Sequence, residues 1–142
     1  MKVLDMGETF EKVIIKNFVD IAMHAKGIIK EDAIRTVETE ALVDTGAAYL
    51  CLPPGDIEKL GLVHSAVKGV TTANGKVDRR IFYGAVIIIK DRGIEMQVME
   101  NAVGTLPLIG YLVLEAMDFV VDSKSQKIIS NPAHAGFSWG YG

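Results

Sequence analysis

Residues 41–54 read ALVDTGAAYLCLPP, an Asp-Thr-Gly triplet between two apolar runs. Asp and Gly are common turn residues, so the triplet could simply connect two strands. The apolar residues on both sides instead predict a turn in the interior of the domain, where an unpaired carboxylate is unfavourable. A carboxylate kept at such a position is a candidate for chemistry, which makes Asp44 the first candidate catalytic residue.

The length and composition indicate one globular domain. A chain of 142 residues is the usual size for this, and we expect a single domain over 1–142, with its core at about 8–131 and a flexible C-terminal tail at 132–142. Hydrophobic residues make up 49% and charged residues 23%, a balance typical of a protein with one core. The net charge of −3 and the lack of a Lys/Arg block argue against nucleic acid as a partner.

The sequence also argues against secretion and against membrane insertion. Its start, MKVLDMGETF, lacks the apolar segment of a signal peptide, and its longest apolar stretch is interrupted by Pro107, Glu115 and Asp118. We therefore expect a cytoplasmic protein. Its one cysteine, Cys51, cannot form an internal disulfide, and its apolar neighbours favour a buried, inert thiol.

Motifs for several other chemistries are missing from the sequence. It contains no G-x-G-x-x-G, Walker A or G-x-S-x-G motif. Its histidines, His24, His64 and His134, are too far apart in sequence to pair at metal-ligand spacing. These chemistries can therefore be set aside, and the carboxylate of Asp44 remains.

Strand-like patterns dominate the chain, so we predict a mainly β domain with one short helix near the C-terminus. That helix is expected at 112–117, and a second short helix at 56–60 would end at Gly61. The strands are expected at 10–19, 36–43, 81–90, 94–99, 118–122 and 127–130, with hairpin turns at Asp91-Arg92-Gly93 and at 123–126.

The segment Leu42-Val43-Asp44-Thr45-Gly46-Ala47 resembles the active-site loop of retropepsin-like aspartic proteases, the clan of the retroviral proteases. VTTANGKVDRRIF at 70–82 lies where the family has its flap, a hairpin that closes over the substrate, and contains the favoured turn pair Asn74-Gly75. Leu108-Ile109-Gly110, followed by LVLEAM, resembles the apolar pair and Gly that precede the family's helix. The resemblance covers roughly residues 35–130 and is closest to the bacterial and cellular branch.

This resemblance implies a closed, barrel-like acid-protease fold and an aspartic endopeptidase that acts on peptides or unfolded proteins. It also implies that no metal and no organic cofactor is required. In such enzymes two carboxylates share one proton; one activates a water and the other polarises the scissile carbonyl. The chain has no second suitable triplet, because Asp91-Arg92-Gly93 has a cation in its middle and Asp122-Ser123 lacks the Gly. We therefore expect a homodimer, with an Asp44 from each subunit at the two-fold axis.

The resemblance also assigns roles to individual residues. Asp44 would be the acid and base, Thr45 would hydrogen-bond across the pair of loops, and Gly46 would let the backbone approach the carboxylate. The cleft floor would be lined by Ala47 and Ala48, and the flap tip would consist of Thr72, Ala73, Asn74 and Gly75.

Two departures from the family pattern keep other functions open. Ala48 stands where many members have Asp, Thr or Ser, and Tyr111 and Leu112 stand where viral members have Arg and a polar residue. A non-catalytic dimerisation or peptide-binding module with the same fold would fit these departures. A plain structural β domain would use the triplet only as a turn.

Overall fold

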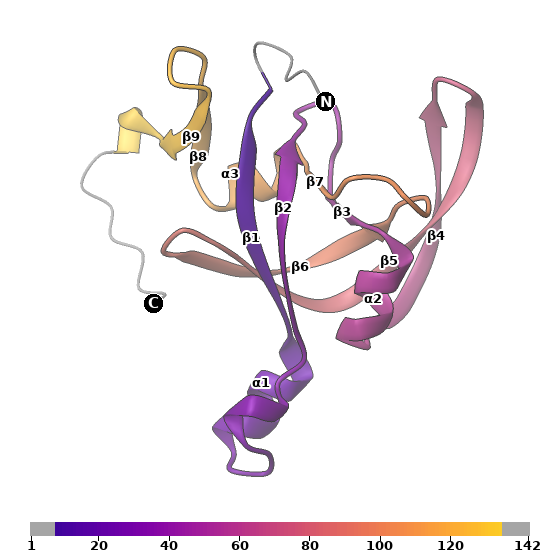
Figure 1. The fold of residues 1–142 in the computed structure, drawn as a ribbon, viewed down its shortest axis with the longest axis vertical. Helices are drawn as coiled ribbons and strands as arrows, with labels where there is room; N and C mark the ends of the chain where they lie inside the picture. Colours follow the sequence, from indigo (N-terminus) through magenta and orange to yellow (C-terminus); the bar gives the residue numbers. More distant parts are fainter. Residues whose placement is uncertain (1–7, 135–142) are drawn as a thin grey trace.

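The computed structural model describes residues 8–134, and nine strands make up about half of this part of the chain (Figure 1). The strands are β1 (Phe10–Asn17), β2 (Thr36–Val43), β3 (Leu50–Leu52), β4 (Val63–Thr72), β5 (Gly75–Ile89), β6 (Arg92–Glu100), β7 (Leu108–Ile109), β8 (Phe119–Asp122) and β9 (Lys127–Ser130). The helices are α1 (Phe18–Ala25), α2 (Pro54–Leu60) and α3 (Tyr111–Ala116), with short 3-10 helices η1 (Glu31–Ala33) and η2 (Pro132–His134).

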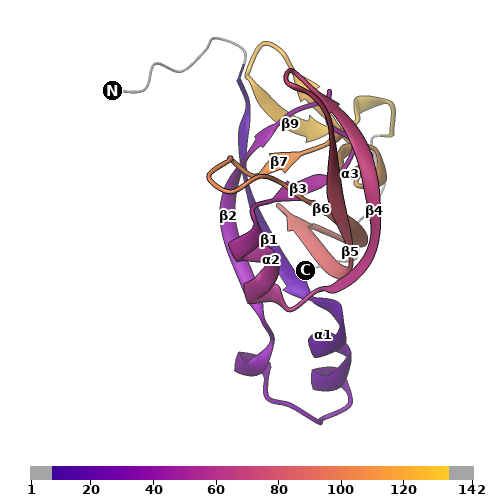
Figure 2. The ribbon, with the colours of Figure 1, turned by 90° about the vertical axis from the view of Figure 1, so that its right-hand side faces the viewer.

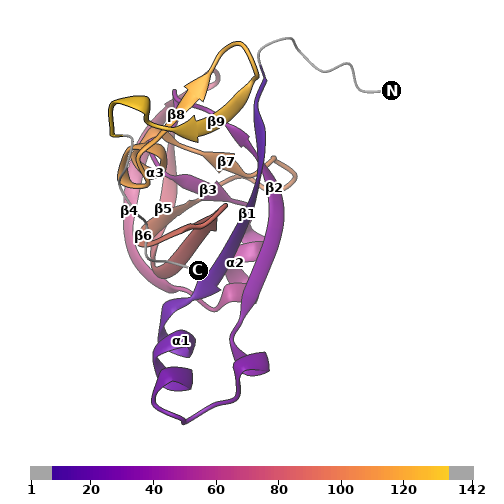
Figure 3. The same ribbon diagram turned by 90° about the vertical axis from the view of Figure 1, so that its left-hand side faces the viewer.

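Six of the strands form a nearly closed ring. Their hydrogen-bonded order is β1-β2-β7-β3-β6-β5, and β5 pairs back with β1. The outer strand β4 extends the sheet from β5, and Figure 2 shows this long β4–β5 hairpin in front of β3 and β7. The separate β8–β9 hairpin and α1 lie at opposite ends of the molecule (Figure 3). The structure thus confirms the predicted mainly β, barrel-like architecture.

The core fills the inside of this ring. On β1 the side chains alternate, so that Val13 and Ile15 are fully buried, while β5 contributes Ile87 and Ile89 and is apolar over most of its second half. The helix α3 closes the core with Val113 and Leu114, together with Met117 directly after it. This packing gives the loops at the ends of β2 and β7 a rigid base.

The predicted strand at 10–19 is wrong in its last two residues, because a helix begins there. Asn17 caps α1, its side-chain oxygen accepting a hydrogen bond from the backbone N–H of Asp20 at 3.0 Å. Phe18 and Val19, which read as strand residues, are 42% and 49% exposed on this helix. The number of helices is therefore three rather than the one or two expected, and α2 and α3 lie at the expected places.

The predicted turn at Asp91-Arg92-Gly93 is also wrong in its last two residues, which belong to β6. The strand β5 runs to Ile89 and β6 begins at Arg92, so the turn consists of Lys90, with φ of 55°, and Asp91. Arg92 is in the strand because its buried guanidinium donates to the carbonyl oxygens of Met117 and Asp118, just after α3. Of the predicted C-terminal tail, 132–134 form η2, and 135–142 lie outside the described residues.

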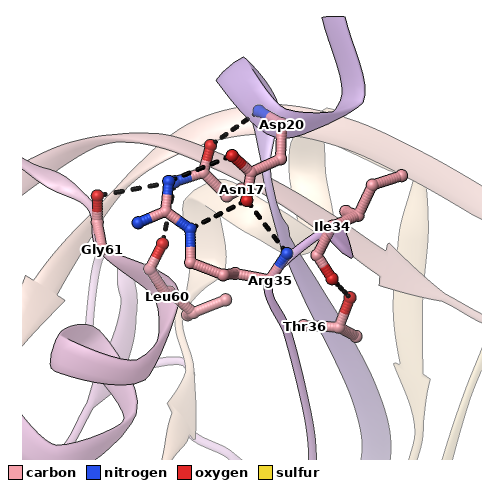
Figure 4. Close-up of polar contacts among 7 residues, drawn as sticks. All are labelled: Asn17, Asp20, Ile34, Arg35, Thr36, Leu60 and Gly61. Carbon is pink, nitrogen blue, oxygen red and sulfur yellow. Dashed lines mark hydrogen bonds and ion pairs between the residues drawn. The ribbon is translucent and has the colours of Figure 1, made fainter. Parts of the chain in front are cut away.

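A polar cluster joins α1, the start of β2 and the end of α2 (Figure 4). The carboxylate of Asp20, which is 3% exposed, accepts hydrogen bonds from the backbone N–H of Arg35 and from its guanidinium at 2.8–3.0 Å. The Asn17 amide donates to the Leu60 carbonyl oxygen at 2.8 Å. Hydrogen bonding to Arg35 lowers the pKa of Asp20, against the opposing effect of burial.

We expect Asp20→Asn to lower the free energy of unfolding by about 2 kcal/mol near neutral pH, because an amide loses charge-assisted hydrogen bonds to Arg35. Because the pKa of Asp20 is lowered in the folded protein, its stabilising contribution is fully present above the pKa of the unfolded chain, about 3.9. It is lost as the pH falls through the pKa of the folded protein. Urea unfolding of both proteins at neutral and acid pH measures this.

The control for this prediction is Glu38→Gln, which breaks the exposed Lys12–Glu38 ion pair. It should change the free energy of unfolding by less than about 1 kcal/mol, because both side chains are solvated. An Asp20→Asn variant as stable as the Glu38→Gln variant at neutral pH would show that the cluster does not stabilise the fold.

Candidate active site

The Asp44-Thr45-Gly46 loop connects β2 to β3, and β7 lies between these two strands. In the register, β7 is parallel to β2 and antiparallel to β3, with Ile109 opposite both Val43 and Leu50. The chain therefore leaves β2, passes over the end of β7, and returns on its other side. This places the loop directly beside Gly110 and the start of α3.

Backbone hydrogen bonds hold both ends of this loop. On the entry side, the N–H of Asp44 donates to the Ile109 carbonyl oxygen at 3.0 Å. On the exit side, the N–H groups of Tyr111 and Leu112 donate to the carbonyl oxygens of Ala47 and Ala48 at 2.9 and 3.0 Å. The two residues that depart from the viral pattern thus anchor the loop through backbone N–H groups, with no need for polar side chains.

The carboxylate of Asp44 is oriented by its own loop. Its Oδ1 accepts a hydrogen bond from the backbone N–H of Gly46 at 2.9 Å. A Cβ at position 46 would lie 3.2 Å from the same oxygen, so the loop closes most easily around Gly. Within residues 8–134 this is the one hydrogen bond made by the carboxylate, and Oδ2 is left for water or another group.

The prediction that the triplet lies in the interior is wrong for the single chain. Asp44 is half-buried, and Thr45 and Gly46 are exposed. The apolar arms are buried as expected, since Ala41 and Leu50 are both 0% exposed, but the loop between them projects from the end of the ring. Water therefore solvates the Asp44 carboxylate, and no buried counter-charge is needed.

A cleft of about 510 Å³ lies between this loop and the β4–β5 hairpin. Of the site residues predicted from the sequence, it brings together Asp44, Gly46, Ala47, Ala48 and Thr72. The remaining four, Thr45, Ala73, Asn74 and Gly75, do not line the cleft of a single chain.

The tip of the β4–β5 hairpin is a short turn, Ala73-Asn74, between long strands. The Thr72 hydroxyl donates to the Gly75 carbonyl oxygen at 2.8 Å and accepts from the N–H of Asn74 at 3.2 Å. Gly75 has a φ of 107°, which few other residues adopt. The turn is thus closed by hydrogen bonds of Thr72 and is exposed at the end of an extended arm.

Sequence reasoning missed several residues of the cleft. Two of them, Lys68 and Val70, lie in β4 and alternate with the predicted Thr72 along the strand, a period-two signal visible in the sequence once the strand is recognised. The other residues missed are Tyr49, Cys51, Thr71, Arg79, Met99, Asn101 and Leu108.

Cys51 is buried, as predicted, with 6% exposure. Burial and, to a smaller extent, the negative charge of Asp44 raise the pKa of its thiol to about 11, while the charge of Arg79 opposes this. A thiol with this pKa stays protonated near neutral pH, which makes it a poor nucleophile.

The described part of the chain holds no group of three or more His, Cys, Asp or Glu side chains that could bind a metal ion. Across residues 8–134, every helix is too short or too polar to span a bilayer.

Comparison with known families matches this part of the chain to a family of proteases. A family model described as gag-polyprotein putative aspartyl protease matches residues 33–116, more than half of the chain. The matched region contains β2, the Asp44 loop, the β4–β5 hairpin and α3. No curated protein matches the chain.

Proposed function

The chain belongs to the gag-polyprotein putative aspartyl protease family, and from this premise we propose that it is an aspartic endopeptidase whose active site forms between two copies. The family match confirms the resemblance to retropepsin-like proteases that the sequence indicated. The observation that carries the proposal is the Asp44 carboxylate, oriented by the Gly46 N–H at the mouth of a cleft. An Asp in an ordinary turn can make the same side-chain hydrogen bond, so it is the cleft in front of the carboxylate that favours chemistry over a plain turn.

The need for two copies follows from the chemistry. Aspartic-protease catalysis uses two carboxylates with one shared proton, because like charges in contact cannot both ionise. One chain supplies one such carboxylate, and its loop is exposed at Thr45 and Gly46, where a second loop can reach it. A closed two-fold dimer would bring the two Asp44 side chains together at its axis.

In the proposed reaction a water lies between the two carboxylates. The ionised Asp44 takes a proton from this water, which attacks the scissile carbonyl carbon, while the protonated Asp44 of the other copy donates a hydrogen bond to the carbonyl oxygen. Collapse of the tetrahedral intermediate breaks the C–N bond, and a proton passes to the leaving amine. The Gly46 N–H fixes Oδ1 throughout, leaving Oδ2 free for these transfers.

The remaining site residues then take supporting roles. The Thr45 hydroxyl would bridge the two loops across the axis, and the small side chains of Ala47 and Ala48 would leave room for a peptide backbone. The β4–β5 hairpin would act as the flap. Its tip at Ala73-Asn74 would cover an extended substrate and exclude water from the reaction.

The activity per chain is expected to rise with protein concentration, because the complete site exists only in the dimer. Below the dissociation constant of the dimer, specific activity should increase in proportion to the concentration and then level off. The measurement is hydrolysis of an unfolded protein over a dilution series, with light scattering at the same concentrations and an inert carrier protein against adsorption. Constant specific activity at concentrations where the chain is a monomer would contradict the proposed site.

A further inference from the structure

Two cationic side chains, Lys68 of β4 and Arg79 of β5, line the cleft that contains Asp44. They are directly opposite each other in the β4–β5 register, and therefore lie on the same face of the hairpin. Like charges at directly opposed positions destabilise a sheet. A hairpin that places them there gains nothing for its own folding, which points to a ligand.

Within residues 8–134, neither of these two cations forms an ion pair with a carboxylate. Lys68 Nζ lies 3.3 Å from the Tyr49 hydroxyl and 5.2 Å from the centre of its ring, both neutral partners. Among residues 8–134, Arg79 has neither a hydrogen bond nor an ion pair to any side chain. Asp44 is the one acidic residue among those that line the cleft.

Arg80, the next residue along β5, differs from Arg79 in having a carboxylate partner. Arg80 points to the opposite face of the hairpin and forms two hydrogen bonds with the Glu100 carboxylate, at 2.9 and 2.7 Å. One of two neighbouring arginines thus has a carboxylate within its own chain, and the one in the cleft does not.

We propose that Lys68 and Arg79 form a subsite for an acidic side chain of the peptide substrate, so that the enzyme prefers sequences with Asp or Glu. This rests on the proposed function, since it needs a peptide in the cleft. A planar guanidinium can bind a carboxylate through two parallel hydrogen bonds, and the Lys68 ammonium adds a second positive charge. In a two-fold dimer each half of the cleft carries one such subsite.

The position of the pair along the hairpin indicates which substrate residues it contacts. The Lys68–Arg79 pair is four register positions from the Thr72–Gly75 pair at the tip, which is about 13 Å along the strands. If the tip covers the scissile bond, the acidic side chain is a few residues away from that bond. The two-fold axis places an equivalent position on the other side.

The test uses the full chain and synthetic peptides that carry one Asp or Glu at each position in turn around a cleavable core. Wild-type protein should cleave peptides with an acid at a fixed position about tenfold faster than their Asn or Gln counterparts. This preference should weaken as salt is added. The double variant Lys68→Met, Arg79→Met should lose it, and Arg79→Glu should favour Lys or Arg instead.

The matched control is Arg80→Met, which removes a cation of the same hairpin outside the cleft and should keep the acidic preference. Cleavage without this preference, or a preference retained in the double variant, would overturn the subsite and leave the proposed function standing. Absence of cleavage would overturn the proposed function. In that case the same peptides, labelled with a dye, are titrated with the Asp44→Asn chain, and their binding is measured by fluorescence anisotropy. Tighter binding of the acidic peptides supports the subsite, and equal binding of acidic and neutral peptides overturns it.

Discussion

Asp44→Asn is expected to lower kcat/KM for peptide hydrolysis by about 10³-fold or more. An amide can still accept the hydrogen bond from the Gly46 N–H, so the loop should keep its shape. It can neither take a proton from water nor share one with its symmetry mate. In a homodimer the substitution removes both carboxylates at once. The measurement is hydrolysis of an unfolded protein by wild type and variant over a range of pH.

The matched control is Asp32→Asn. Asp32 is exposed in η1 and does not line the cleft, so its substitution should leave hydrolysis unchanged. Equal activity of the Asp44→Asn variant and wild type would mean that the hydrolysis arises elsewhere. A wild-type chain that forms a dimer and binds peptides without cleaving them would instead fit a non-catalytic module of the same fold.

Local sequence was enough to find the Asp44 loop and most strands. The alternation in β2 and the apolar residues of β5 are properties of short segments, and so is Gly61 after α2, whose φ of 60° suits a helix end. The helix α1 was missed because its start depends on Asn17 and Asp20, whose side chains are held by residues distant in sequence.

The cleft was harder to predict for a related reason. Lys68 and Arg79 become neighbours only when the register of β4 and β5 is known, and the ring itself closes through pairing of β1 with β5. The predicted burial of Asp44 was wrong because an apolar pattern shows only that the residues on either side of the turn are buried. It does not show whether the turn between them is covered by its own chain, or is open to water and to a second chain.

Gly110→Ala should have the largest effect on stability. Gly110 has φ of −85° and ψ of 172°, an extended conformation that any residue adopts, so backbone freedom is not the reason for Gly here. The reason is space, because an added Cβ would lie 2.4 Å from the carbonyl carbon of Ala48 and 2.5 Å from its oxygen. A contact this close to backbone forces the Asp44 loop and α3 apart. We expect a loss of about 3 kcal/mol in the free energy of unfolding, measured by urea denaturation.

The same displacement should remove hydrolytic activity even in molecules that remain folded, because Leu112 would no longer hold the carbonyl oxygen of Ala48. The control is Gly55→Ala in the first turn of α2, where an added Cβ would meet nothing within 4 Å. There Ala should stabilise the protein by about 0.5–1 kcal/mol through its helix propensity. The two Gly→Ala substitutions would then change the free energy of unfolding in opposite directions, because Gly55 faces solvent and Gly110 faces the loop that carries Asp44. A Gly110→Ala variant that unfolds at the same urea concentration as wild type would show that this contact is not tight in solution.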